Sequence, residues 1–189
     1  MKNNTHGTKW RSARVLIAGA LATVTLAGGN AAWATGDGSV YVSGNSTFSD
    51  CGIDGSDLAL LMTGDLEGCL SIFVRGFTCK ELVGFDQYIE RGREVFVGTY
   101  HGKQGRFTTN YTVNSVYAKG FCQSFDFSTE LSGSCIHHVQ GRSGIFSNAE
   151  GVLTLFDVIT NVTGDPVTGT FTAGTGANNF LYAGRIQLD

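Results

Sequence analysis

The clearest pattern in the chain is a two-residue alternation between Arg106 and Ala118. The odd positions carry most of the large side chains: Phe107, Thr109, Tyr111, Val113 and Tyr117. Positions 108, 110, 112 and 114 are all polar. Because successive side chains of a β-strand point to opposite faces, this pattern predicts a strand with one buried face.

A second alternating segment runs from Phe125 to Val139. Its odd positions place Phe127, Cys135 and His137 on the apolar face, whereas His138 lies on the opposite face. Residues 119–123 separate the two segments. We therefore expect a long hairpin with its turn at these residues.

Further strands are predicted over residues 58–64, 69–77, 88–100, 151–159 and 180–188. A turn is expected at residues 141–144 and a loop at 161–169, which holds the only proline, Pro166. About seven or eight strands and no convincing helical spacing indicate an all-β sandwich or barrel. We favour a small antiparallel barrel, because glycines within strands permit tight coiling and closure removes exposed edges. The glycines in question are Gly76, Gly92, Gly98, Gly133 and Gly184.

The first 34 residues have the features of a cleavable signal peptide. Four basic residues precede an apolar run from Val15 to Ala27, and no acidic residue occurs before Asp37. Residues 32–34 (Ala-Trp-Ala) offer small side chains at the two positions that a signal peptidase reads. We expect a signal peptide over 1–34, a single domain over 35–189, and a secreted or periplasmic product without a membrane span.

Removing the signal peptide changes the charge balance. Of 13 basic residues nine remain, against 16 acidic ones, so the expected mature domain has a net charge of −7 with histidines neutral. This sign argues against nucleic acid and anionic lipid as partners, since both attract clustered Lys and Arg.

Five cysteines follow the signal peptide, and an exported protein meets conditions in which disulfides persist. Two bridges among five cysteines can be drawn in about 15 ways, so spacing does not fix the pairing. We expect the odd cysteine to be a buried free thiol. The chain contains no C-x-x-C pair, so we expect no metal site.

Three residues are candidates for acid–base chemistry. His137 faces the apolar side, where it acts either as an acid or base near neutral pH or as a hydrogen-bonded structural residue. Glu90 and Glu94 lie four residues apart on one strand and therefore share a face. If that face is internal, the two carboxyls share a cavity of low dielectric constant; an outward, solvated face is the alternative.

Aromatic residues supply the candidate ligand contacts. Tyr111, Tyr117, Phe127 and Tyr182 are placed on inward faces by the alternation. Each either contacts a ligand or fills the core.

Several segments in order resemble bacterial secreted proteins with an allene oxide cyclase barrel-like domain. The segments are LMTGDLEGCLSIF from residue 61, IERGREVFVGTY from 89, GRFTTNYTV from 105, LSGSCIHHVQGRSGIF from 131 and YAGRI from 182. The resemblance implies an eight-stranded antiparallel barrel shared with plant allene oxide cyclases and dirigent proteins. It implies no cofactor and transfers no catalytic residue, and position 138 is a histidine where these relatives often have proline.

The resemblance also implies a disulfide and a class of ligand. Cys69 and Cys135 both lie in the matching segments, which suggests that they pair. The plant relatives steer cyclisation or coupling of a small apolar molecule and assemble as dimers or trimers. We thus expect a small hydrophobic ligand and a homo-oligomer.

Three functions remain open at this point. The barrel binds a small hydrophobic molecule as a cofactor-free cyclase or isomerase, or binds it as a carrier without chemistry. Alternatively, it is a solid structural or interaction protein of the cell envelope.

Overall fold

The structure is a computed structural model that describes residues 38–159, 163–165, 170–172 and 176–188. The predicted signal peptide, residues 1–34, lies outside the described residues. No helix in the described part of the chain is long and apolar enough to cross a membrane.

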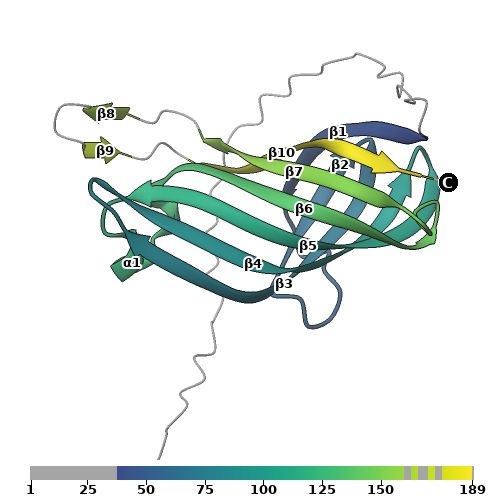
Figure 1. Ribbon diagram of the computed structural model, residues 1–189, viewed down its shortest axis with the longest axis horizontal. Coiled ribbons are helices and arrows are strands. Elements are labelled where there is room, and N and C mark those ends of the chain that lie inside the picture. Colours follow the sequence, from purple (N-terminus) through teal and green to yellow (C-terminus); the bar gives the residue numbers. More distant parts are fainter. Residues whose placement is uncertain (1–37, 160–162, 166–169, 173–175, 189) are drawn as a thin grey trace, which may run out of the picture. The chain divides into compact units, whose positions relative to one another are not determined.

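Eight strands form a closed antiparallel barrel (Figure 1). They are β1 (Ser39–Phe48), β2 (Leu58–Gly64), β3 (Leu66–Glu81), β4 (Phe85–Tyr100), β5 (Lys103–Ala118), β6 (Glu130–Gly144), β7 (Glu150–Ile159) and β10 (Gly176–Gln187). The ring closes because β1 pairs with β2 on one side and with β10 on the other. β8 (Thr163–Asp165) and β9 (Thr170–Thr172) form a separate two-stranded sheet.

The eight-stranded antiparallel architecture confirms the predicted fold class, with β1 as the strand that the sequence pattern missed. Three local predictions were wrong. Residues 141–144 belong to β6, and the expected loop at 161–169 contains β8. The strand predicted from Phe125 begins only at Glu130, because Phe127–Thr129 form a 3-10 turn, η1, and the expected turn at 119–123 contains helix α1 (Phe121–Ser124).

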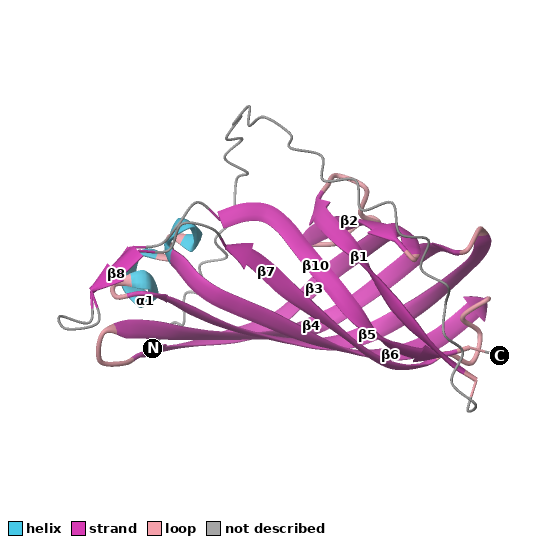
Figure 2. Ribbon diagram, turned by 90° about the horizontal axis from the view of Figure 1, so that it is seen from above, coloured by secondary structure: helices cyan, strands magenta, loops and turns pink. Residues whose placement is uncertain are grey.

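Strands β3 to β6 are longer than their neighbours and run beyond the ring (Figures 1 and 2). β2 pairs with β3 only up to Ile72, and β7 pairs with β6 only between residues 134 and 140. Helix α1 covers the inner face of this extension, where Phe121 packs on Tyr88 and Tyr117. The extension is thus a half-open sheet with a short helical cap.

A buried carboxylate holds this cap in place. Asp86 on β4 accepts hydrogen bonds from the backbone N–H groups of Gly120 and Cys122 and from Lys119 Nζ. Burial alone would raise the pKa of Asp86, but these donors together lower it. A disulfide between Cys79 and Cys122 adds a covalent link from β3 to α1.

The main apolar core fills the closed part of the barrel, beyond the extension that α1 covers. Phe96, Phe107 and Phe146 are fully buried, and the rings of Phe96 and Phe107 stack with centroids 4.6 Å apart. The Tyr182 hydroxyl on β10 reaches the backbone of Leu66 on β3, which is three strands away in the ring. The core therefore joins strands from opposite sides of the barrel.

We expect the substitution Phe107→Ala to lower the free energy of unfolding by about 3–5 kcal/mol, because it leaves a cavity in a fully buried aromatic cluster. The control Phe156→Ala removes a ring that is 47% exposed on the outer face of β7 and should change stability by about 1 kcal/mol or less. Denaturant unfolding of both variants measures the difference. Equal losses would contradict the assignment of inner and outer faces.

Candidate functional site

Glu94 and His137 form a buried pair inside the barrel. Glu94 lies on β4 and His137 on β6, with β5 between them. His137 Nδ1 lies 2.6 Å from a Glu94 carboxylate oxygen, and the Thr109 hydroxyl on β5 donates to the same oxygen. The side chains of both Glu94 and His137 are 2% exposed. The structure thus places Glu94 on the internal face and confirms the predicted inward direction of His137.

The second ring nitrogen of His137 is unpaired. Nε2 is buried and has no hydrogen-bond partner among the described residues. The ring of Tyr111 lies beside the imidazole, with centroids 6.1 Å apart and planes inclined by 29°. A buried nitrogen without a partner is unusual, because buried polar atoms are nearly always hydrogen-bonded.

Glu90 occupies a neighbouring position on the internal face. Its two carboxylate oxygens accept hydrogen bonds from the hydroxyls of Tyr88, at 2.6 Å, and Tyr111, at 2.8 Å. Burial raises the pKa of both tyrosine hydroxyls above the usual range, and the hydrogen bond to Glu90 raises it further. The two phenols therefore stay protonated and remain donors at physiological pH.

The internal face has room for these groups because of one glycine. Gly92 lies opposite Tyr111 in the β4–β5 pair. A Cβ atom at Gly92 would collide with the ring of Tyr111 and with the backbone oxygen of Phe73. The glycine thus leaves room for the Tyr111 ring against β4, with its hydroxyl at Glu90.

Cys135 is the free cysteine and lies two residues before His137 on the same face of β6. The predicted Cys69–Cys135 disulfide is wrong, because Cys69 faces outward and forms a bridge with Cys51. Burial, with further contributions from Glu94, Asp157 and Glu90, raises the pKa of the Cys135 thiol. The expectation of one free internal thiol is confirmed, with Cys135 partly buried.

A pair of carboxyls that the sequence analysis did not predict lies farther along the interior. Glu130 and Asp157 both approach Gly133, where a Cβ atom would collide with either side chain. Burial, which is the larger effect, and the charge of Asp157 together raise the pKa of Glu130 to about 8. Burial also raises the pKa of Asp157. The pair therefore shares at least one proton near neutral pH.

Two signals bear on these missed residues. Asp157 is at an odd position of β7, in phase with the buried Leu153 and Leu155, so its inward direction was readable from the alternation. Glu130 falls on the polar face by simple alternation. A register irregularity between β5 and β6 at Val116 and Tyr117 lies opposite Glu130 and was invisible in the sequence pattern.

The predicted ligand-contacting aromatics have different positions. Tyr111 and Tyr117 are buried on the internal face, as expected. The Tyr182 hydroxyl is used in its two hydrogen bonds to Leu66, so this residue has a structural role. Phe127 is not on a strand; it lies in η1, is 51% exposed and contacts the aromatic cluster under α1.

No group of three or more metal-ligating side chains occurs within the described residues. Comparisons of the chain with protein-family models, with curated proteins and with solved structures find no match. The site therefore consists of a histidine held by a carboxylate, a tyrosine pair on a second carboxylate, and a thiol in the same row across the strands as that second carboxylate.

We expect alkylation of the denatured, unreduced protein to modify one cysteine, Cys135. In the native protein the reaction should be slow, because a partly buried thiol with a raised pKa has little thiolate. Peptide mapping by mass spectrometry identifies the modified residue. The variant Cys135→Ser should take up no label, and modification of Cys69 would contradict the observed pairing.

The Glu130–Asp157 pair predicts a pH-dependent stability. The unfolded chain releases the Glu130 proton near pH 4–5, whereas the folded protein holds it up to about pH 8, so the free energy of unfolding falls as pH rises through this window. Glu130→Gln should flatten this dependence and gain roughly 1–3 kcal/mol over the wild type between pH 5 and 8. Urea unfolding at several pH values measures the gain.

The matched control for this experiment is Glu150→Gln, which removes an exposed carboxylate from β7, the strand that carries Asp157. Its unfolding curve should keep the wild-type slope with pH. A wild-type slope in Glu130→Gln would show that the pair does not hold the proton.

Proposed function

We propose that the barrel binds a small hydrophobic molecule and exchanges a proton with it at His137, in a cofactor-free isomerisation or cyclisation. The observation that carries this proposal is the unpaired Nε2 atom of His137, opposite the nitrogen that Glu94 holds. A histidine oriented in this way has one nitrogen fixed by Glu94 and a second, buried nitrogen whose lone pair a bound substrate would meet.

The Glu94 carboxylate determines which nitrogen of the His137 imidazole carries the proton. Glu94 accepts a hydrogen bond from Nδ1–H, which leaves the lone pair of the neutral ring on Nε2. When Nε2 takes a proton from a substrate C–H bond, the resulting imidazolium lies against the Glu94 carboxylate. The proton then returns from Nε2 to another carbon or oxygen of the same molecule, so the reaction needs no external reactant.

Burial along the internal face suggests where the molecule would lie. His137 and Glu94 are almost fully buried, whereas Glu90, Val113 and Cys135 in the adjacent row are partly exposed. These three residues face one another across β4, β5 and β6. A ligand along this row would contact apolar groups such as Leu155 and have His137 at its inner side.

The tyrosines supply the complementary group. Tyr88 and Tyr111 keep their phenolic protons, as argued above, and both donate to Glu90. A substrate carbonyl that displaces one of these contacts would accept a hydrogen bond from a protonated phenol. Such a donor stabilises the enolate that forms when a neighbouring C–H bond loses its proton.

Two disulfides support a place of action outside the reducing cytoplasm, since such bonds persist in oxidising compartments. This agrees with the proposed secreted or periplasmic location. We further propose that the chain is related to allene oxide cyclase barrel-like proteins. This part of the proposal rests on the sequence segments alone.

The test begins with gently purified protein, from which bound small molecules are extracted and identified by mass spectrometry. The identified molecule is then incubated with the protein in D₂O, and NMR follows the uptake of deuterium at carbon. We expect wild-type protein to promote the exchange and His137→Gln to reduce its rate by about 100-fold or more while retaining the ligand.

The control variant His101→Asn removes an exposed histidine from the β4–β5 turn and should exchange at the wild-type rate. Retention of the ligand with no exchange in any variant would leave a carrier without chemistry. Failure to recover any hydrophobic molecule would overturn the binding proposal itself.

A further inference from the structure

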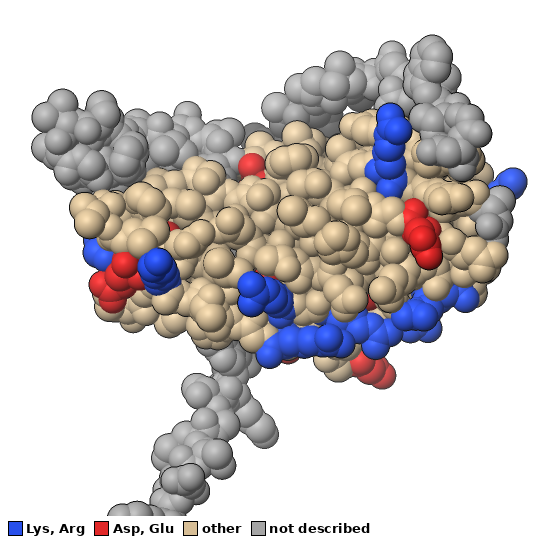
Figure 3. Space-filling model, viewed as in Figure 1, with Lys and Arg blue, Asp and Glu red and all other residues tan. Residues whose placement is uncertain are grey.

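The outer face of the long strands is basic, although the expected mature domain is acidic as a whole. Outward or exposed positions of β3 to β6 carry seven Lys and Arg residues. Lys103 lies at the start of β5, and the other six form the basic face: Arg75, Lys80, Arg91, Arg93, Arg106 and Arg142. The acidic residues at outward or exposed positions of these strands are Glu67 and, at the end of β3, Glu81, which pairs with Lys119. Figure 3 shows a run of Lys and Arg side chains along the lower margin of the barrel.

These cations are free of carboxylates in the part of the chain that the structure describes. The ion pairs there involve Lys119 and His137, and none involves the six residues of the basic face. Arg142 bonds to the neutral side chains of Thr108 and Gln140. The basic face therefore has the positive charge for an anionic partner without an internal counter-ion.

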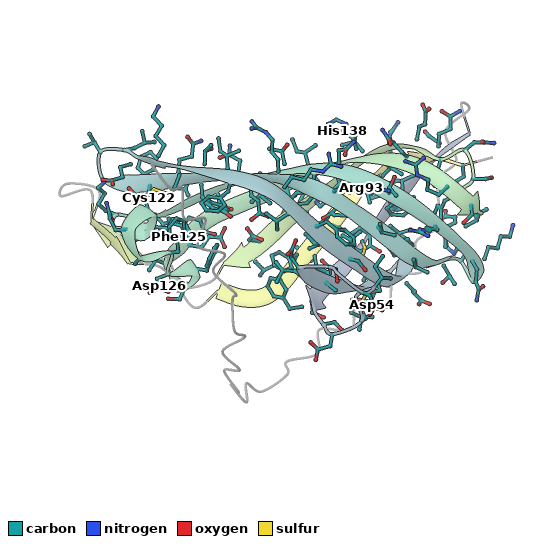
Figure 4. All side chains as sticks on the ribbon, turned by 90° about the horizontal axis from the view of Figure 1, so that it is seen from below. Asp54, Arg93, Cys122, Phe125, Asp126 and His138 are labelled. Carbon is teal, nitrogen blue, oxygen red and sulfur yellow. A yellow bond between two sulfur atoms is a disulfide. The ribbon has the colours of Figure 1, made fainter. Side chains whose placement is uncertain are left out.

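A groove of about 640 Å³ lies within this face. Its walls include Arg75, Arg91 and His138, together with the neutral polar side chains of Thr78, Asn110 and Thr112. No Asp or Glu lines it. Arg93 and His138, labelled in Figure 4, belong to the same outer surface and flank Asn110 across β5.

A β-bulge builds the groove. The pairing of β3 with β4 shifts between Val74 and Gly76, so that Arg75 is an extra residue beside Arg91. Bulges re-aim side chains in this way. Two arginines that line one groove without a carboxylate repel each other, and an anion between them would remove that repulsion.

We propose that this groove binds an acidic polysaccharide, with its carboxylate groups on Arg75 and Arg91. The guanidinium fork matches a carboxylate in two hydrogen bonds. The hydroxyl and amide groups of Thr78, Asn110 and Thr112 match sugar hydroxyls. Arg93 and Arg142 extend the positive charge past the groove, as a chain with repeated negative charges requires.

Two other polyanions fit the groove less well. Single-stranded nucleic acid binds to platforms of exposed aromatic rings. Of the aromatic rings at this groove, Tyr111 is buried, and Phe77, although 52% exposed, points to the inner face of β3, where it packs on Tyr88 and Phe125. A flat anionic membrane would present charged headgroups, but no repeat of sugar hydroxyls, to Thr78, Asn110 and Thr112.

The experiment measures binding of a polygalacturonate oligomer by calorimetry at low salt, with neutral dextran as the uncharged comparison. We expect binding to polygalacturonate only, with weakening as salt rises. The double variant Arg75→Ala/Arg91→Ala should lose affinity by roughly tenfold or more. Arg75→Gln/Arg91→Gln gives the same test with longer polar side chains if the alanine variant does not fold.

The matched control Arg185→Ala removes one exposed arginine from the outer face of β10 and should change the affinity less than about twofold. The proposal is overturned by absence of binding, by equal losses in the control, or by tighter binding to oligothymidylate or phosphatidylglycerol vesicles.

Discussion

Each side chain on a barrel strand has two directions available, and the interior of this protein depends on that constraint. Half of the residues of β4, β5 and β6 must point inward, including Glu90, Glu94 and His137. A buried charge is costly unless hydrogen bonds or an opposite charge compensate it. The structure meets this requirement with a donor from the neighbouring strand β5 against each of the two carboxylates, Thr109 at Glu94 and Tyr111 at Glu90. His137 from β6 adds a second contact to Glu94, and Tyr88 from β4 itself adds a second donor to Glu90.

The alternation in the sequence predicted a large part of this arrangement, and its failures have physical causes. The phase of β5 and β6 correctly placed Tyr111 and His137 inside and His138 outside, because these strands are regular there. The face of Glu90 and Glu94 was ambiguous, since Val95 and Val97 interrupt the pattern with apolar residues on the polar side. Both valines lie on the outer face of β4, where Val95 is buried and Val97 is exposed. This face therefore carries apolar side chains, and alternation alone does not distinguish it from the inner face.

The alternation in the sequence predicted neither the β-bulges nor the pairing of the cysteines. The position of Cys69 on the outer face makes a bond to the internal Cys135 impossible without inverting a strand. The helical cap was missed because four residues are too few for a helical period to show, and it depends on Asp86 and the Cys79–Cys122 bridge from elsewhere in the chain. The net charge of the domain likewise did not predict the charge of its outer surface, because several acidic side chains are inside the barrel while most arginines are outside.

The irregularity at Arg75 also acts as a phase change along β3. Before it, Cys69 points outward toward the β1–β2 loop; after it, Cys79 points inward toward α1. One strand is thereby covalently fastened on both surfaces of the sheet. An insertion or deletion of a single residue at this point would turn Phe77 and Cys79 to the opposite surface, so the length of β3 is constrained more strictly here than the identity of its side chains.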